Sequence, residues 1–390
     1  MTADPLAGPA RHLASGGPAG AAWSRRDFVR LGAAAVAGAG LSPTLAGGRT
    51  GRRFSPAELQ QVLDDAARAL GIVGAQLAVF DGSDVIELAT GSANLELGLE
   101  ATADTLFQIG STTKVMNACV VMSLVDEGVL DLDRPVRTWI DGFRLADRTA
   151  TRGVTLRQLL SMSAGVDNGP YTDHGRGDDA LSRYVASLAE VPHVFAPGTA
   201  FGYSNAGTCI AGLAAQRAAG KSWETLLEER ILAPLGLERS ASFGEDLLFH
   251  SVSLGYRVPD TGREPERVPV WALPRSMAPA GATHSSSAGD LVRVARKFLA
   301  GGRSAGGGQV LSPTSVATLH RPQVTLPARL IAQRWCTGPY WKQWGGEVIY
   351  GHSGTNSGGS SLLLWCPARN VAAATIANVP SQGYPLADRV

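Results

Sequence analysis

The chain has 390 residues, of which 44% are hydrophobic and 18% are charged, a composition typical of globular proteins rather than disordered ones. Its 35 basic and 34 acidic residues give a formal net charge of +1, so no global field attracts nucleic acid or an anionic membrane. Binding partners must therefore be selected by local chemistry.

The first 46 residues differ in character from the rest of the chain. Arg25 and Arg26 are followed by a weakly hydrophobic run, rich in alanine and glycine, that reaches Ala46. Paired arginines before such a run resemble a twin-arginine signal peptide; a disordered, arginine-bearing tail is the alternative. The run does not suit a membrane anchor, because it is short and Pro43 and glycines interrupt it. We expect residues 1–46 to direct twin-arginine export, with a secreted or periplasmic product.

Twin-arginine export implies that the protein folds before it crosses the membrane, which weakens any argument from the oxidising destination to disulfides among the four cysteines. Cys119 and Cys209 lie in apolar helical runs and are expected to be small core residues. Cys336 and Cys366 flank a strand-rich segment and could pair, although free thiols are favoured. Cys119 is the first cysteine of the chain, so no cysteine near the cleavage point could receive a lipid.

The segment that follows the signal predicts a helix and then strands. Ser55-Pro56 has the pattern of a helix N-cap with proline at the first helical position, and the amphipathic period continues to Leu70. Short apolar runs at residues 75–80 and 85–89, separated by Asp-Gly-Ser-Asp, predict a β-hairpin. Residues 111–125 are apolar almost all the way round a helix, which places that helix inside the protein.

The middle of the chain predicts helices and loops, and the last part predicts strands. Helical segments are expected at residues 156–161, 180–188, 208–219 and 223–231, and again at 289–299. Strand-like runs follow at 347–350, 361–365 and 371–377.

This order of elements predicts an α+β fold, in which both ends of the chain complete one antiparallel β-sheet flanked by helices. We expect a domain over residues 54–390, with a sheet subdomain at about 54–130 and 271–390. A helical subdomain at about 131–270 is inserted into it, and a cleft between the two is the natural ligand site.

The sequence Ser111-Thr-Thr-Lys114 stands at the start of the buried helix, where a charged lysine is unexpected. Residues three apart share one helix face, so the amine can reach the hydroxyl. Burial lowers the pKa of a lysine, and a neutral amine can accept the proton of a serine nucleophile. The structural alternative is that Ser111 is an N-cap and that Lys114 extends its amine to solvent.

A second pattern, Phe201-Gly-Tyr-Ser-Asn-Ala-Gly207, is a loop that leads into a helix. Tyr203 could transfer protons, and Asn205 could donate an amide N–H to a substrate carbonyl. The alternative is that Asn205 caps the following helix while Tyr203 packs nearby.

A third pattern places His352, Gly354 and Thr355 at the end of a predicted strand. Glycine allows another backbone to approach closely, which suits a substrate that lies along the strand edge. The Thr355 N–H could then stabilise an oxyanion. A lone histidine on a strand is more often a structural residue.

Each pattern occurs once, in the order Ser-x-x-Lys, Tyr-x-Asn, His-x-Gly. In this combination the chain resembles the serine β-lactamase and penicillin-binding protein superfamily, in its D-alanyl-D-alanine carboxypeptidase and esterase branches. The resemblance begins at about Phe54 and continues to the C-terminus. It also includes Phe107–Gly110, Glu127–Asp133, Pro197–Phe201, Pro234–Leu237, Pro279–Ala282 and Asp290-Leu291.

The resemblance implies a β-lactamase/transpeptidase-like fold and a role for each residue of the three patterns. Ser111 would be the acylated nucleophile, Lys114 its activating partner and Tyr203 the proton carrier for the leaving group. Asn205, His352, Gly354 and Thr355 would contact the substrate, with the Ser111 and Thr355 N–H groups forming the oxyanion hole. No cofactor and no metal is implied.

Two departures from the family pattern affect the prediction. The run from Leu160 to Gly165 stands where many relatives have His-Thr-Ser-Gly, so its local packing is open. His352 replaces a lysine, and a neutral imidazole attracts a carboxylate less than an ammonium does. Substrates with a free carboxylate, including β-lactam drugs, are therefore expected to bind poorly near neutral pH.

The expected function is an exported serine hydrolase acting through an acyl-enzyme on an ester, an amide or a D-alanyl peptide, with β-lactams among the candidates. The expected partner is a small-molecule or peptide acyl substrate such as cell-wall peptide, without nucleic acid, and with membrane contact only during export. The alternative is a penicillin-binding or cell-wall-sensing protein of the same fold that is acylated without turnover.

Two other hydrolase classes do not fit the sequence. An α/β-hydrolase needs Gly-x-Ser-x-Gly with a later histidine, but Thr355 occupies the fifth position and no histidine follows His352. Metal-dependent hydrolysis lacks its usual spacing, since the seven histidines are scattered and His-Glu-x-x-His does not occur.

Overall fold

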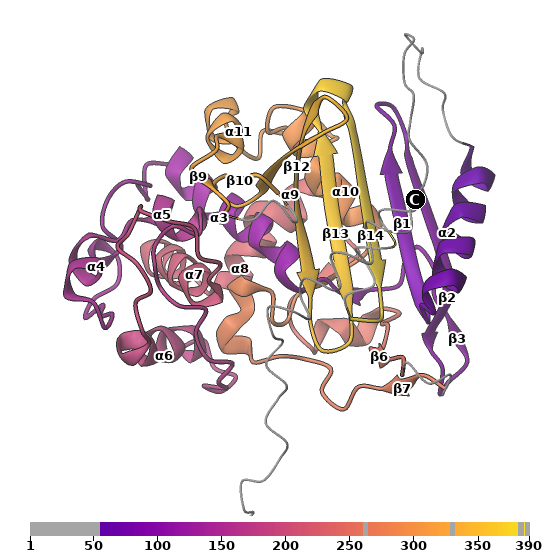
Figure 1. Cartoon of the computed structure of the whole chain (residues 1–390), viewed down its shortest axis with the longest axis horizontal. Coiled ribbons are helices and arrows are strands. Elements are labelled where there is room, and N and C mark those ends of the chain that lie inside the picture. Colours follow the sequence, from indigo (N-terminus) through magenta and orange to yellow (C-terminus); the bar gives the residue numbers. More distant parts are fainter. Residues whose placement is uncertain (1–54, 260–263, 328–331, 381–385, 387–390) are drawn as a thin grey trace, which may run out of the picture. The chain divides into compact units, whose positions relative to one another are not determined.

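An antiparallel sheet organises the protein, seen in a computed structural model that describes residues 55–259, 264–327, 332–380 and 386 (Figure 1). The predicted signal peptide lies outside these residues. The sheet has nine strands in the order β3-β2-β1-β14-β13-β12-β11-β10-β9. Its strands are β1 Gly74–Phe80, β2 Val85–Asn94, β3 Leu99–Glu100, β9 Val324–Thr325, β10 Arg334–Trp335, β11 Tyr340–Trp344, β12 Glu347–Thr355, β13 Ser360–Cys366 and β14 Val371–Ala377.

The two ends of the chain meet where β1 pairs with β14. Ala75 lies opposite Ala377 and Phe80 opposite Ala372, so the N-terminal hairpin and the C-terminal strands form one continuous sheet. This arrangement confirms the predicted antiparallel sheet built from both ends of the chain.

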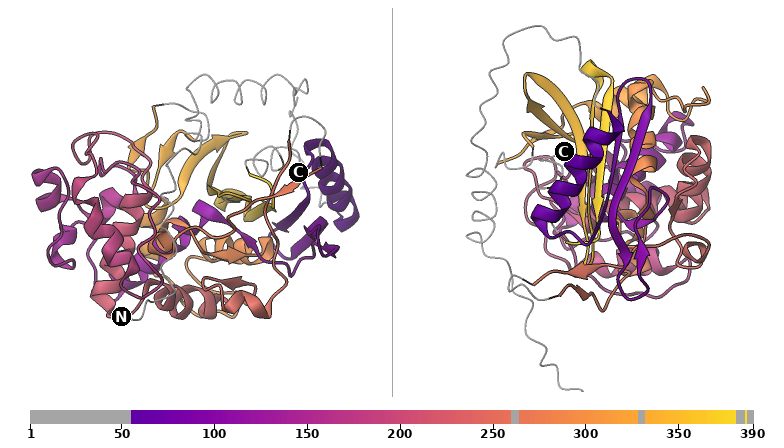
Figure 2. Two further views of the ribbon diagram at one scale, coloured as in Figure 1. Left: turned by 90° about the horizontal axis from the view of Figure 1, so that it is seen from below. Right: turned by 90° about the vertical axis from the view of Figure 1, so that its right-hand side faces the viewer.

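Helices cover both faces of the sheet (Figures 1 and 2). Helix α2 (Pro56–Leu70) begins with the capping box predicted at Ser55 and packs its leucines against Ala75 and Leu77 of β1. Helix α10 (Ala288–Leu299) contacts β14 and β1, on the face to which Ala78 points. The alternation of side chains along a strand explains how consecutive residues of β1 serve two separate cores.

The remaining helices lie mainly beside the sheet, with α3 (Thr113–Asp126) among them (Figure 1). Every α3 residue from Thr113 to Leu124 is buried, as its all-round apolar character predicts. The others are α4 Arg148–Gly153, α5 Leu156–Leu160, α6 Ala180–Ser187, α7 Asn205–Ala219, α8 Trp223–Leu227, α9 Ala233–Leu235 and α11 Pro313–His320. Within the described residues, no helix has the length and apolar character needed to span a membrane.

Short strands complete the structure. A small three-stranded sheet contains β4 (Phe107–Gln108), β8 (Ser285–Ser286) and β5 (Ser240–Ala241), and a separate hairpin contains β6 (Tyr256–Arg257) and β7 (Glu266–Arg267). The sequence patterns did not predict these strands, nor β9 to β11 and α11. Two-residue strands are set by their partners rather than by a local period.

All four cysteines are buried free thiols. Cys119 and Cys209 are core residues, as predicted. Cys336 and Cys366 do not pair, so the favoured alternative is confirmed.

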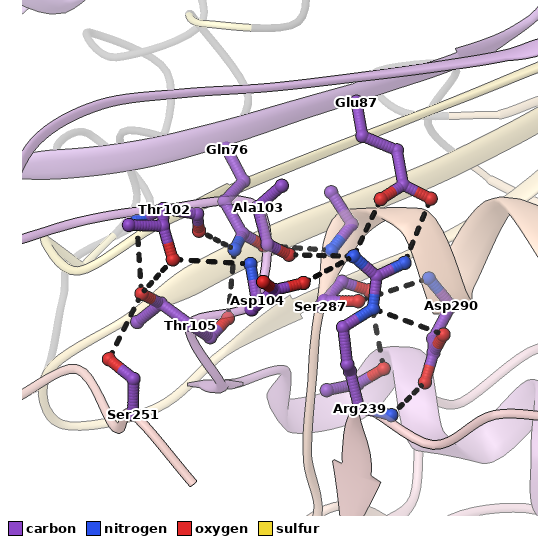
Figure 3. A network of polar contacts seen from close by, with 12 residues as sticks. Gln76, Glu87, Thr102, Ala103, Asp104, Thr105, Arg239, Ser251, Ser287 and Asp290 are labelled. Carbon is purple, nitrogen blue, oxygen red and sulfur yellow. Dashed lines mark hydrogen bonds and ion pairs between the residues drawn. The ribbon is translucent and has the colours of Figure 1, made fainter.

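A partly buried ionic cluster links α10 to the N-terminal hairpin (Figure 3). The Arg239 guanidinium lies 2.6 Å from a Glu87 carboxylate oxygen, and the Arg239 backbone N–H donates to Asp290. Asp290 belongs to the first turn of α10, where the Ser287 side chain is the N-cap. Burial alone would raise the pKa of Glu87, but Arg239 and Arg293 hold it below the usual range. The guanidinium thus offsets the partial burial of Glu87, whereas burial outweighs the arginines at Asp290 and raises its pKa.

We predict that Arg239→Met lowers the free energy of unfolding by about 1.5–3 kcal/mol, because Glu87 loses two charge-assisted hydrogen bonds. Arg293 still pairs with Glu87 and Asp290 in the variant and limits the loss. Equilibrium urea unfolding measures the effect. The matched control is Arg369→Ala, which breaks a more exposed ion pair with Glu347 and should cost less than about 1 kcal/mol. Equal effects of the two substitutions would show that the cluster is not a special source of stability.

Candidate active site

The predicted nucleophile lies in a tight turn directly before α3. Ser111 is the middle residue of the 3₁₀ turn Gly110–Thr112, and its Oγ accepts a hydrogen bond of 2.8 Å from Lys114 Nζ. The N-cap position of α3 is Thr112, which makes no side-chain cap. Ser111 is therefore not an N-cap of α3, and the structure brings the predicted pair into direct contact.

Lys114 does not extend to solvent. Its side chain is 1% exposed, and Nζ also donates to the Ala280 carbonyl oxygen at 2.7 Å. Burial lowers the pKa of Lys114 to about 7, because charging an amine away from water is costly. A substantial fraction of the lysine is then neutral near pH 7, which a proton acceptor for Ser111 requires.

Three glycines let separate segments close around this turn. Gly110 has φ 52° and Gly281 has φ 102°, in the left-handed region that favours glycine. A Cβ on Gly281 would lie 2.0 Å from the Gly110 carbonyl oxygen, and a Cβ on Gly354 would lie 1.8 Å from the Ile109 carbonyl oxygen. The backbone that approaches Gly354 is thus the nucleophile turn itself.

Tyr203 and Asn205 stand at the start of α7. The N-cap is Ser204, whose Oγ accepts from the Gly207 N–H, so the alternative that Asn205 is the cap is wrong. The Tyr203 ring is half-buried, and Lys114 Nζ lies 5.0 Å from its centre. Asn205 Nδ2 donates to the Tyr171 hydroxyl at 2.8 Å. Tyr171 belongs to none of the three sequence patterns, yet it contacts the side-chain amide that is predicted to bind substrate.

The run from Leu160 to Gly165, whose packing the sequence left open, supports the Tyr203 loop. Met162 has φ 58°, a conformation that costs free energy in a residue other than glycine. Its carbonyl oxygen accepts from the Gly202 N–H at 2.8 Å, and its sulfur accepts from the Ser204 N–H at 3.4 Å. The strained turn at Met162 therefore binds the residue before and the residue after Tyr203.

His352 is enclosed by aromatic rings. It is 1% exposed, and the centre of its ring lies 5.3 Å from that of Trp335, 6.4 Å from Tyr203 and 6.5 Å from Tyr340. Nδ1 is 2.7 Å from the Ser353 carbonyl oxygen, so Nδ1 carries the proton. Burial lowers the pKa of His352 to about 3, with the charge of Lys114 adding to the effect. The imidazole is therefore neutral near pH 7.

A hollow with a volume of about 250 Å³, which includes open solvent, lies beside Ser111. Three predicted residues line it, and Lys114, Tyr203, His352 and Gly354 are not among its lining residues. The apolar part of the wall was not predicted from the sequence. The lining residues are Ser111, Tyr171, Asn205, Leu273, Met277, Ala280, Gly281, Ala282 and Thr355. Ala280 to Ala282 were noted as part of the family resemblance, but nothing local marks Tyr171, Leu273 or Met277.

Comparison with known proteins agrees with this geometry. A family model described as Beta-lactamase matches residues 59–389. The chain belongs to the β-lactamase family. Penicillin-binding protein 4 of Amycolatopsis lactamdurans is 38% identical over 329 residues, which cover 83% of this chain and 86% of the relative. The resemblance inferred from the three patterns is confirmed.

Two further comparisons show the range of this hydrolase-containing family. Esterase EstB of Burkholderia gladioli is 33% identical over 199 residues, which cover 46% of this chain and 50% of EstB. The crystal structure of SurE is 31% identical, with a TM-score of 0.75, and the match covers 86% of this chain and 74% of SurE. SurE has also been crystallised with D-Leu. The chain is thus similar both to a protein named for penicillin binding and to one named as an esterase.

Proposed function

We propose that this β-lactamase family member is a serine hydrolase that forms an acyl-enzyme at Ser111. The observation that most supports this function is the contact between Ser111 Oγ and Lys114 Nζ, made by an amine whose pKa burial lowers to about 7. Such an amine has the driving force to accept a proton near neutral pH.

The proposed reaction follows from the position of each group. Ser111 Oγ attacks the substrate carbonyl carbon while Lys114 accepts its proton, and the Ser111 and Thr355 N–H groups stabilise the oxyanion. Tyr203, whose ring centre is 5.0 Å from Lys114 Nζ, transfers the proton to the leaving group. Water then attacks the ester carbonyl, and the same groups return the proton to Ser111.

We propose a substrate whose acyl side is apolar and whose leaving group has no carboxylate. Leu273, Met277 and Ala282 supply apolar wall to the hollow, which favours a hydrophobic acyl group. On the side of the third pattern, His352 is neutral and surrounded by aromatic rings, so it offers no positive charge to a carboxylate. The names of EstB and of SurE with D-Leu are compatible with ester and D-amino-acyl substrates.

A rate comparison tests this substrate class. We predict that an acyl-D-alanyl-D-alanine peptide with an amidated C-terminus has a kcat/KM at least about 10-fold higher than the same peptide with a free carboxylate, since the neutral His352 does not compensate a buried carboxylate. A short-chain ester and a cephalosporin complete the set. A preference for the free carboxylate would contradict the substrate class while leaving acylation at Ser111 intact. Stoichiometric labelling without turnover would instead favour the sensor alternative.

We also propose that the protein is exported by the twin-arginine route, on the basis of Arg25, Arg26 and the weakly hydrophobic run after them. Changing both residues to lysine is predicted to keep the protein in the cytoplasm. Cell fractionation and immunoblotting measure the distribution, with Arg11→Lys as a control outside the pair. Normal secretion of the double variant would remove the argument for this route.

A further inference from the structure

A buried amine and a buried thiol meet between α3 and α10, outside the proposed active site. Lys297 Nζ lies 2.7 Å from Cys119 Sγ. Lys297 is 1% exposed and Cys119 is 0% exposed. Their contact joins the middle of α3 to the last turn of α10, across 178 residues of sequence.

The surroundings of Lys297 make this contact unusual. Burial of an ammonium normally requires a carboxylate partner, yet among the described residues Lys297 forms no ion pair with one. Its Nζ lies 4.0 Å from the centre of the Phe298 ring, and its charge adds to the burial that lowers the pKa of His320 to about 4. The ring nitrogen Nε2 of His320 already accepts from Trp365. Cys119 is therefore the group that satisfies the amine.

We infer that Cys119 and Lys297 form an oxidation site, at which hydrogen peroxide produces a covalent sulfur–nitrogen bond between α3 and α10. Peroxide oxidises a cysteine sulfur to a sulfenic acid, which can condense with a thiol or with a nitrogen nucleophile. A sulfenic acid formed beside an amine has a nucleophile in contact with its sulfur. This inference does not depend on the proposed hydrolase function.

The chemistry balances with peroxide as the oxidant. The Cys119 sulfur attacks one peroxide oxygen, the O–O bond breaks, and the departing hydroxide takes a proton from the Cys119–Lys297 pair to become water. The Lys297 nitrogen then attacks the sulfur of the sulfenic acid, the S–O bond breaks, and hydroxide leaves with a nitrogen proton as a second water. Sulfur loses two electrons and peroxide gains them, and a dithiol reductant reverses the bond.

Mass spectrometry of the full chain tests the inference. After treatment with dilute hydrogen peroxide, free thiols are alkylated under denaturing conditions and the protein is digested. We expect the peptide containing Cys119 to be joined to the peptide containing Lys297, about 2 Da below the sum of the two masses, and released by dithiothreitol. Recovery of Cys119 as an alkylated thiol, or as sulfinic acid with Lys297 free, would overturn the inference.

Two controls identify the reacting atoms. Cys336 donates to the His320 carbonyl oxygen, and burial raises the pKa of its thiol to about 12, so it should remain alkylatable in the same sample. In Lys297→Met the joined peptides should be absent. Their persistence would show that another nitrogen reacts and would also overturn the inference. Fragment sequencing of the wild-type joined peptides decides the question even if the variant does not fold.

Discussion

Ser111→Ala is expected to abolish covalent labelling by a fluorescent penicillin or a phosphonate probe, with a loss of at least about 10³-fold in the labelling rate. Alanine removes the only atom that forms the acyl bond in the proposed reaction. It leaves the Gly110–Thr112 turn free to form, because Ser111 Oγ is not a helix cap. Gel fluorescence at equal protein concentration measures the effect, and circular dichroism shows whether the fold is retained.

The matched control for this experiment is Ser83→Ala. Ser83 lies in the turn between β1 and β2, and its exposed hydroxyl bonds to Asp81. Its replacement should leave labelling within about twofold of the wild type, as expected for an exposed residue outside the site. Labelling of Ser111→Ala at the wild-type rate would falsify the assignment of the nucleophile.

Lys114→Met is expected to lower the acylation rate by at least about 10³-fold and to remove its dependence on pH near 7. In the proposed reaction, Lys114 accepts the Ser111 proton only when neutral. Because its pKa is about 7, the rate should rise with pH up to about 7 and then level off. Stopped-flow or quenched labelling between pH 5.5 and 9 gives this profile. A wild-type profile that is flat across this range would contradict the role of Lys114.

The same substitution has a predictable effect on stability. The pKa of Lys114 is about 7 in the folded protein against 10.5 ordinarily, so as pH falls from 10.5 the unfolded chain takes up the proton first. Stability is therefore lost between about pH 10.5 and 7, by roughly 1.4 kcal/mol per pH unit, and no further below pH 7.

Lys114→Met removes this pH-dependent loss of stability. Part of the gain is offset, because the Ala280 carbonyl oxygen loses the hydrogen bond that Lys114 donates. We expect the melting temperature of Lys114→Met relative to wild type to rise as pH is lowered from 10 to 7. Lys221→Met, at an exposed ion pair with Glu229, should show no such trend. A variant that gained nothing relative to wild type over this range would argue against a costly buried amine.

Short-range patterns were sufficient for several parts of this protein. Ser55-Pro56 predicted the start of α2 because a helix cap depends on neighbouring residues. The contact of Ser111 with Lys114 was predictable for the same reason, since three residues along a helical turn place two side chains on one face. The order of apolar runs was enough to predict an antiparallel sheet flanked by helices.

Contacts between distant segments needed the tertiary structure. Tyr171 meets Asn205 across 34 residues, and Ala280 O meets Lys114 across 166. A local sequence pattern does not predict contacts between residues so far apart in the chain, because these contacts depend on how strands and helices pack. The sequence likewise predicted that another backbone approaches Gly354, but only the structure identifies it as the backbone at the carbonyl oxygen of Ile109.

The sequence by itself was sufficient to propose which residues carry the chemistry, since Ser111, Lys114, Tyr203 and His352 stand in local patterns with recognisable order. The tertiary structure alone decided their electrostatic state. Burial of Lys114 beneath the closed turn and of His352 among aromatic rings lowers both pKa values, because segments remote in the sequence exclude the water that would stabilise the charged forms.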